Sequence, residues 1–379
     1  MKELSKKINN LSLKNISVSI LFYIAYFFII MSDIFNSISA FENVLNIIDV
    51  ISVGILMVVI ISNKKVGKNE ILLWLFLIIV AISALKSNDR SLLKLPFLLL
   101  AFKNINFNKF IKLDMFFRLI LITVLMLFNI AGITDNGILE VRDGFVRNSF
   151  GLGHPNSFAF YIVMICLDYF YINSIKKKNS IIKPLLLVII AIAFIFFFVG
   201  SRTNIIILIL IYIVFLLKNK IKFGEKNIII YSFGICMLGS ILCAYLYDPN
   251  NSFFVSLDNI LSRRLYLANY FVNKYPLTLF GNKVVTGGFY ALDNAYVNLF
   301  VRYGIVLSVY FIVMFRNTFK TLIKNKQYTL VLVLTIFSIY GISETPMYIP
   351  AKNPYILLLA LSWVNNTKKI KEGKNKNNE

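Results

Sequence analysis

The chain has 379 residues, of which 58% are hydrophobic, and its mean hydropathy is +0.74. This composition excludes an ordinary soluble domain and predicts an integral membrane protein, because many apolar runs are long enough to cross a bilayer. The formal net charge of +22 would suggest nucleic acid as the partner of a soluble protein. Here the lysines are better explained as topology determinants at the cytoplasmic membrane face. We therefore expect the lipid bilayer as a partner and no nucleic acid.

The chain begins with lysines ahead of its first apolar run, and no small-residue cleavage site follows that run. We therefore expect a retained first helix and not a removed signal peptide. The cysteines lie inside apolar runs, where free thiols behave as small hydrophobes, so neither a disulfide framework nor a metal site is expected. They are Cys166, Cys236 and Cys243.

The apolar runs predict an all-α protein with about twelve transmembrane helices and both termini in the cytoplasm. The fourth and the last runs are short and carry Pro96 and Pro354. We count them as crossings, because a topology without the fourth would put the next three lysine clusters outside, against the positive-inside rule. The expected spans are 16–32, 44–62, 71–85, 91–102, 113–132, 155–173, 184–200, 204–217, 228–246, 294–315, 328–342 and 354–365.

This topology predicts a single polytopic membrane domain over residues 1–379. Two extracytoplasmic loops are long, at about 133–154 and 247–293, and the second is long enough to form small helices over a cavity. Residues 366–379 form a Lys/Asn-rich cytoplasmic tail.

In this topology most arginines lie on the side of the membrane opposite to most lysines. Arginine presents a planar fork that binds phosphate or carboxylate bidentately and stays charged when desolvated. An arginine-rich outer face therefore predicts an anionic ligand handled outside the cell. Only Arg316 falls on the cytoplasmic side; Arg90, Arg142, Arg147, Arg202, Arg263 and Arg264 fall on outer loops, and Arg118 and Arg302 lie within spans.

The first polar cluster is Arg147–Asn156, which contains the only histidine of the chain. Pro155 suits the first turn of a helix, where its missing N–H costs nothing, and this places His154 near the N-cap of the sixth span. A helix N-terminus with a nearby arginine is a ready anion site. The alternative is a polar cap that only ends a loop.

Two further clusters are expected on the same membrane face. Gly200–Asn204 forms a tight turn between two spans, so that Arg202 reaches the outer interface; the alternative is a charged hairpin tip. Ser262–Tyr266 holds Arg264 in the long second loop; the alternative is a surface helix with two solvated arginines.

The fourth cluster is Asp293–Gly304, at the start of the predicted tenth span. Asn294, Asn298 and Arg302 recur every four residues, so they are expected on one helix face. At 1.5 Å per residue, Arg302 would lie on the order of 12 Å below Asn294. An arginine in a span is costly unless it faces protein or water. The spacing therefore predicts a polar stripe that lines a wet cavity.

These four clusters, in this order, resemble the Wzy polysaccharide polymerases, which belong with the O-antigen ligases in one superfamily. The likeness covers roughly residues 147–304 and the number of spans. Gly151-x-Gly-His-Pro-Asn156 looks most like polymerases of capsular or exopolysaccharide. The resemblance implies a GT-C-like membrane fold in the bacterial cytoplasmic membrane, with the active site facing outside.

The resemblance also implies a glycosyltransferase that uses no nucleotide sugar, no metal and no cofactor. Donor and acceptor would both be oligosaccharide repeat units on undecaprenyl pyrophosphate. Expected partners are the flippase and a chain-length regulator of the same pathway. The pyrophosphate groups would be bound by Arg147, Arg202, Arg264 and Arg302, and the glycan by Asn156, Asn294, Tyr296 and Asn298.

The catalytic base is open between two residues. The ligases carry a histidine just before the asparagine at the start of the helix that corresponds to the tenth span, whereas this chain has Leu292-Asp293-Asn294 there. Either Asp293 takes that role or His154 does. An imidazole suits proton abstraction near neutral pH, which slightly favours His154.

Three other functions compete with a polymerase. An O-antigen ligase would transfer a finished glycan to a lipid A core, and the absent histidine before Asn294 counts against it. A flippase for lipid-linked oligosaccharides needs polar or ionisable groups near the membrane midplane. The interior spans of this sequence look nearly free of such groups, which counts against a flippase. A structural subunit would leave the polar stripe of the tenth span unexplained.

Overall fold

Most of the chain is helical in a computed structural model, which describes residues 2–63, 70–134, 140–142, 145–175, 181–218, 220–224, 227–287 and 291–362. The chain divides into two compact units that interleave in sequence, and each is described by itself. Unit 1 comprises residues 1–66, 97–212 and 368–379, and unit 2 comprises residues 67–96 and 213–367. The single polytopic domain expected from the sequence stays a prediction.

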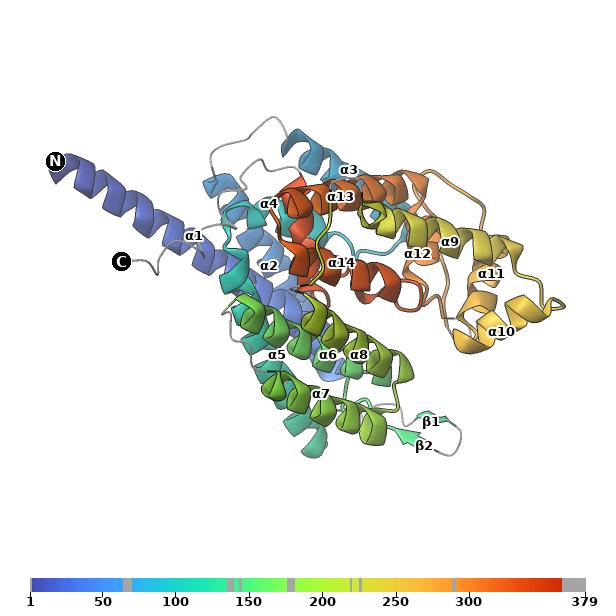
Figure 1. The fold of residues 1–379 in the computed structure, drawn as a ribbon. Coiled ribbons are helices and arrows are strands. Elements are labelled where there is room, and N and C mark those ends of the chain that lie inside the picture. Colours follow the sequence, from blue (N-terminus) through green and yellow to red (C-terminus); the bar gives the residue numbers. More distant parts are fainter. Residues whose placement is uncertain are drawn as a thin grey trace. The chain divides into compact units, whose positions relative to one another are not determined.

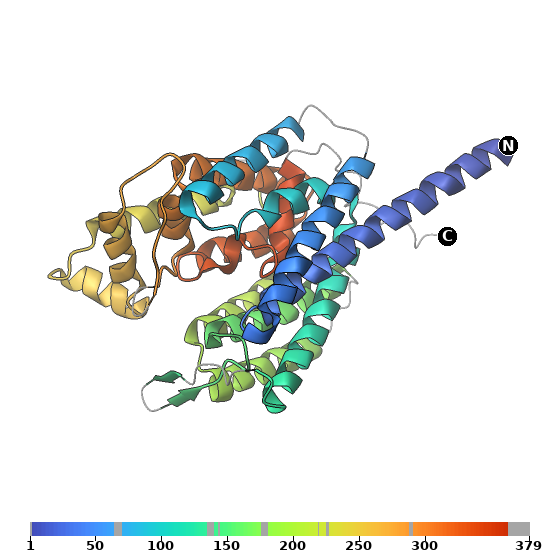
Figure 2. The ribbon, with the colours of Figure 1, turned by 180° about the vertical axis from the view of Figure 1, so that it is seen from behind.

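Unit 1 is built around four long helices: α1 packs against α2 and α5, and α5 packs against α6 (Figures 1 and 2). A short antiparallel pair of strands precedes α6, with Val141 opposite Val146. The elements are α1 Lys2–Phe35, α2 Glu42–Ser62, α5 Phe107–Ile130, β1 Glu140–Arg142, β2 Phe145–Arg147, α6 Pro155–Ile175, α7 Ile182–Phe194, a π-helical turn Ile195–Val199, and α8 Arg202–Leu217 up to Tyr212.

Unit 2 is organised around α13, which contacts α3, α9, α14 and the C-terminal 3-10 helix (Figure 1). α11 packs against α9, and α10 packs against α11. The elements are α3 Glu70–Ser87, α9 Ser232–Leu246, α10 Ser252–Ile260, α11 Arg264–Lys274, α12 Ala295–Asn298, a π-helical turn Leu299–Tyr303, α13 Ile305–Lys324, α14 Tyr328–Tyr340, and 3-10 helices Ile228–Tyr231, Thr345–Tyr348 and Pro354–Ser362. α4, Lys94–Ala101, joins the two units.

Helices long and apolar enough to cross a membrane confirm the prediction of a multi-pass membrane protein. Three shorter apolar helices, Ile71–Ser87, Arg202–Leu217 and Tyr328–Tyr340, accompany the long ones. Among the residues that the structure describes, the long candidates are Ser17–Phe35, Ser39–Ser62, Phe107–Ile130, Pro155–Ile175, Ile182–Val199, Ile228–Leu246 and Ile305–Lys324.

The expected count of about twelve spans is not confirmed. The predicted span 91–102 contains the eight-residue helix α4, and the predicted span 354–365 contains a nine-residue 3-10 helix. At the rises of these helix types, they are about 12 Å and 18 Å long. Both are shorter than the roughly 30 Å of a bilayer's hydrocarbon core.

The predicted tenth span, 294–315, is broken where the sequence analysis expected one continuous helix. α12 has four residues, the π-helical turn Leu299–Tyr303 follows, and the backbone turns at Gly304 with φ 91° and ψ 173° before α13 begins. A π-helical turn shifts the side chains away from the 3.6-residue period. All three predicted polar residues precede the break at Gly304, and the stripe of Asn294, Asn298 and Arg302 stays a prediction.

A strap of chain, residues 276–282, fills the break. The amides of Ile305 and Val306, in the first turn of α13, donate to carbonyl oxygens of the strap at 3.1 Å each. In return, the Asn282 amide donates to the Arg302 carbonyl at 3.2 Å. Backbone groups that a helix end leaves without intrahelical partners are thus satisfied by the strap.

Candidate functional site

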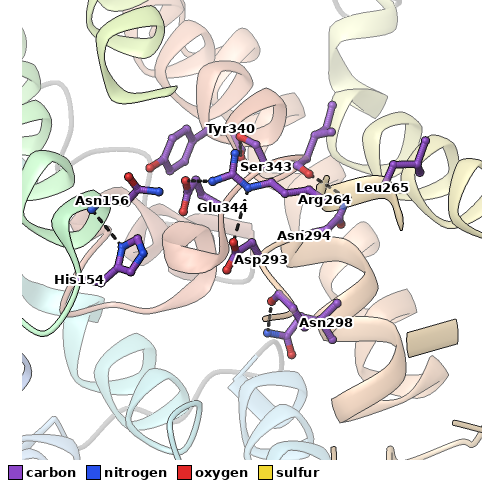
Figure 3. A network of polar contacts seen from close by, with 12 residues as sticks. His154, Asn156, Arg264, Leu265, Asp293, Asn294, Asn298, Tyr340, Ser343 and Glu344 are labelled. Atoms are coloured by element: carbon purple, nitrogen blue, oxygen red, sulfur yellow. Dashed lines mark hydrogen bonds and ion pairs between the residues drawn. The ribbon is translucent and has the colours of Figure 1, made fainter. Parts of the chain in front are cut away.

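The start of α6 forms as the sequence predicts. Pro155 is the first helical residue, and the backbone N–H of Asn156 donates to Nδ1 of His154 at 3.1 Å (Figure 3). The imidazole therefore caps one of the amides that a helix N-terminus leaves without a partner. The His154 side chain is otherwise exposed.

Arg147 lies beside this helix start in unit 1. Its Nη2 donates to Oδ1 of Asn156 at 2.7 Å, and its Nε donates to the Val199 carbonyl at 3.2 Å. The side-chain amide of Asn204 donates to the Asn156 carbonyl at 3.2 Å and to Ser201 Oγ at 2.8 Å. The first and second predicted clusters are thus brought together, and Arg147, although charged, is buried.

Arg202 differs from Arg147 in being exposed. It is the first residue of α8 and follows Gly200, whose φ of 65° ends the π-helical turn. The position agrees with the predicted tight turn, which leaves the guanidinium at the surface. An exposed guanidinium at a helix start is a suitable contact for an anion.

The third cluster is organised by carboxylates in unit 2. Arg264 begins α11, and its Nη2 lies 2.5 Å from Oε1 of Glu344 while its Nε lies 3.6 Å from Oδ2 of Asp293 (Figure 3). Arg264 and Glu344 are buried, but the Asp293 side chain is 41% exposed. One guanidinium thus faces two carboxylates, and of these Asp293 is the one open to a ligand.

The turn before α11 is fixed by Asp258. Its Oδ1 accepts the amides of Leu265 and Tyr266 at 2.9 Å each. Ser262 and Arg263 adopt left-handed backbone conformations, with φ of 55° and 65°, which non-glycine residues rarely take. This strained turn fixes where the Arg264 side chain leaves the chain.

Glu344 was not predicted from the sequence. It follows α14 in the turn Gly341–Glu344, which also binds the start of α12: the Ala295 amide donates to the Gly341 carbonyl at 2.9 Å. An acidic residue at the end of an apolar run is the feature of the sequence that marks this position.

The remaining predicted residues of α12 are bonded to protein groups. Asn294 caps the helix by accepting the amides of Tyr296 and Val297 at 3.0 Å each, and it donates to the Ile342 carbonyl at 2.9 Å. Tyr296 is fully buried, and its hydroxyl donates to the Ser338 carbonyl at 2.5 Å. These contacts place Asn294 in the frame of the cluster and Tyr296 in the core.

Asn298 is buried, and its side-chain amide donates to the Leu292 carbonyl at 3.4 Å. Within the described chain its Oδ1 atom has no hydrogen-bond partner. A buried amide oxygen without a partner is costly, so Asn298 has an acceptor to offer a donor that reaches it. Its part in a wet cavity stays a prediction.

Arg302 forms an ion pair with Asp89, in the loop after α3. Next to it, the hydroxyls of Ser91 and Tyr303 share a hydrogen bond of 2.8 Å. Burial raises the pKa of Asp89, but hydrogen bonds from the Ser91 amide and from Arg302 outweigh it, and the pKa ends below its usual range. Arg302 therefore fastens this loop to the π-helical turn.

The spans of unit 1 contain buried ionisable side chains, and the expectation that the interior spans are nearly free of polar residues is wrong. Asp114 and Arg118 of α5 are both 0% exposed and form an ion pair of 2.6 Å. The Tyr26 hydroxyl of α1 also donates to Asp114 at 2.6 Å.

The polar contacts continue along α6. The Arg118 guanidinium lies 5.3 Å from the ring centre of Tyr161, and the Tyr161 hydroxyl donates to Asp33 at 2.5 Å. Asp168, two turns further along α6, is also fully buried. The four-residue spacing of Asp114 and Arg118 within an apolar run is the feature of the sequence that indicates this pair.

Within each unit the structure thus gathers one set of predicted residues: Arg147, His154 and Asn156 with the Gly200–Asn204 turn in unit 1, and Arg264, Asp293 and Asn294 in unit 2. Among the described residues, no group of three or more His, Cys, Asp or Glu side chains is arranged to hold a metal ion. No protein-family model, curated protein or solved structure matches the chain.

Proposed function

We propose that this chain is a membrane glycosyltransferase that joins oligosaccharide repeat units carried on undecaprenyl pyrophosphate, as the Wzy polymerases do. The product would be a capsular, exopolysaccharide or O-antigen chain, made at the outer leaflet of the bacterial cytoplasmic membrane. The resemblance of the four sequence clusters supports this reaction class.

The observation that carries the proposal is the cluster of Arg264, Asp293 and Glu344. A carboxylate that is 41% exposed, beside a buried guanidinium and at the start of α12, has the access that a general base needs. Glu344 neutralises part of the Arg264 charge, so that Arg264 orients Asp293 and does not bind a phosphate alone.

The geometry of His154 supports Asp293 as the base. Because Nδ1 of His154 accepts the Asn156 amide, the neutral ring carries its proton on Nε2. In that tautomer Nε2 is a donor, and the ring has no second lone pair for a substrate proton while the cap is kept. We therefore assign the base to Asp293 and give His154 a donor role toward an anionic oxygen.

Of the arginines expected to bind pyrophosphate, Arg202 is the exposed one. Arg147 donates to Asn156 and Val199, and Arg302 is paired with Asp89. Within unit 1 we assign a contact with an anionic oxygen to Arg202 and a framework role to Arg147, and within unit 2 we assign a framework role to Arg302. Electrostatic stabilisation of the leaving group is the largest contribution to many reactions of this kind.

In the proposed step, an acceptor hydroxyl oxygen attacks the anomeric carbon of the donor glycan. A new carbon–oxygen bond forms as the bond from the anomeric carbon to the phosphate oxygen breaks. The lipid pyrophosphate leaves with the electron pair, and the hydroxyl proton passes to Asp293. No oxidant, reductant or metal ion is needed for this balance.

The test compares Asp293→Asn with Asp248→Asn, an exposed carboxylate of the same predicted outer loop. Both changes remove one negative charge and keep the side-chain shape. In cells lacking the wild-type gene, Asp293→Asn is expected to stop chain elongation and to accumulate single lipid-linked repeat units on the outer leaflet. Asp248→Asn should keep long chains. Normal chain lengths with Asp293→Asn would contradict the assignment of the base.

A lipid-linked oligosaccharide flippase is the second candidate. The buried groups Asp114, Arg118 and Asp168 favour it, because ionisable residues inside spans often mark transport pathways. The leaflet on which repeat units accumulate separates the two functions. Accumulation on the inner leaflet, measured by labelling glycans in intact and in opened cells, would overturn the polymerase and support the flippase.

A further inference from the structure

Helix α10, Ser252–Ile260, has one apolar and one polar face. Phe253, Leu257 and Ile260 follow one another at the spacing of a single helix face. Phe253 is 66% and Ile260 79% exposed. The exposed residues Ser252, Ser256 and Asn259 lie on the neighbouring face, about 100° round the helix.

The helix is held in place by aromatic and capping contacts. The ring of Tyr247, the residue after α9, lies 6.1 Å from the ring of Phe254 and 6.2 Å from that of Tyr266. Asp258 faces the protein and caps α11. α10 therefore cannot turn its apolar face inward without losing that cap, and Phe253 and Ile260 remain outside.

The position of α10 is set by the membrane-spanning helix before it. α10 lies beyond the carboxyl end of α9 and beside α11 (Figures 1 and 2). The lipid-facing side of α9 ends in the same place, since its exposed apolar side chains continue to the last helical residue. These are Ile235, Leu238, Leu242, Tyr245 and Leu246.

We propose that α10 docks into the bilayer leaflet from which α9 emerges, with Phe253 and Ile260 among the upper acyl chains. The apolar side of α10 then continues the lipid-facing side of α9. The polar residues Ser252, Ser256 and Asn259 face water. Such an interfacial helix has an apolar face buried a few ångströms below the headgroups.

Charge at the end of α10 fits the same surface. Arg263, three residues after Ile260, is exposed, and its guanidinium matches lipid phosphates. Tyr266 is also exposed, and tyrosines are enriched at the level of the headgroups. The docked helix would hold the turn before Arg264 at the membrane surface. The docking itself follows from α9 and α10 and does not rest on the proposed function.

The test places a fluorophore on either face of α10. In a full-length chain with Trp74→Phe and Trp363→Phe, either Ile260→Trp or its neighbour Asn259→Trp supplies the only tryptophan. Each protein is reconstituted in vesicles of phosphatidylcholine and phosphatidylglycerol, with or without phosphatidylcholine brominated near the top of its acyl chains. Ile260→Trp is expected to emit at shorter wavelength and to lose at least half of its intensity to the brominated lipid. Asn259→Trp should instead be quenched by aqueous iodide.

Equal quenching of the two positions by iodide, with no effect of brominated lipid, would overturn the proposal. Emission of Ile260→Trp that depends on the protein-to-lipid ratio and not on bromination would overturn it in favour of a second copy of the chain. Phe253→Trp repeats the measurement at the other end of α10. A folding defect of one variant therefore leaves the test intact.

Discussion

Nη2 of Arg264 lies 2.5 Å from Oε1 of Glu344, a residue 80 positions further along the chain. Both side chains are about nine-tenths buried, so neither charge is screened by water as a surface pair is. Removing one partner of a buried pair leaves the other charge without compensation. The pair therefore joins the start of α11 to the turn after α14.

Glu344→Gln tests the importance of this pair. The variant keeps the side-chain shape but removes the charge, and we expect the free energy of unfolding to fall by about 2 kcal/mol. Thermal unfolding in detergent measures the loss. Glu42→Gln, at the exposed first position of α2, is the matched control and should cost less than about 1 kcal/mol, the usual contribution of an acidic residue at a helix N-terminus. Equal behaviour of the two variants would show that Arg264 does not depend on Glu344.

The strap 276–282 makes two glycines indispensable. A Cβ on Gly281 would overlap the Arg302 carbonyl, and one on Gly304 would overlap the Leu279 carbonyl. Both residues also have positive φ, 94° and 91°, where other residues are strained. We expect Gly281→Ala and Gly304→Ala each to destabilise the protein on the order of 3 kcal/mol.

Gly239→Ala is the control for these two variants. Gly239 lies within α9, and a Cβ added there meets no atom within 4 Å. Alanine is the better helix former, so this change should stabilise the protein slightly, by less than about 1 kcal/mol. Unfolding temperatures of the three variants in one detergent provide the comparison. A loss of stability in Gly239→Ala as large as in the other two would refute the role of the strap.

The pair of Asp114 and Arg118 in α5 gives a double-mutant test. Arg118→Leu leaves the Asp114 carboxylate buried without its ion pair, at an expected cost of about 3–5 kcal/mol. Adding Asp114→Leu removes the uncompensated charge and should recover part of the loss. Unfolding of the single and double variants in detergent measures the interaction. An additive result would show that the two side chains do not stabilise each other.

Local features of the site were predictable from the sequence, and contacts between distant segments were not. Pro155 marks a helix start through its own ring, so the beginning of α6 and the place of His154 could be predicted. The pairing of Arg302 with Asp89 joins residues 213 positions apart. No periodicity within one segment contains that information.

The continuous helix predicted over 294–315 is broken in the structure for a related reason. The break at Gly304 depends on backbone hydrogen bonds between the start of α13 and the strap 276–282, and no periodicity within the span itself indicates them. The partner of Arg264 was missed because Glu344 lies outside the four clusters. Arg118 was noted as lying within a span, but its partner Asp114, one turn earlier, was not considered.

Asp89 predicts a pH dependence of stability. Its pKa in the folded protein is lowered, whereas an unfolded chain has an aspartate pKa of about 3.9. The contribution of the Arg302–Asp89 pair is therefore complete above about pH 3.9 and disappears as the pH falls through the lower folded pKa. We expect wild type to unfold at a higher temperature than Asp89→Asn at pH 6, and the difference to shrink below about pH 4. A difference that stays constant down to pH 3 would contradict this.

Two variants of His154 distinguish a role in capping α6 from a role in the proposed reaction. His154→Ala removes the Nδ1 acceptor of the Asn156 amide and should lower the free energy of unfolding by about 1 kcal/mol. His154→Asn supplies a side-chain oxygen that caps the same amide, so its stability should return to that of wild type. If the imidazole donates to an anionic oxygen in the proposed reaction, His154→Asn remains unable to elongate glycan chains although it is stable. Full elongation by His154→Asn would instead make the cap the whole role of the only histidine in the chain.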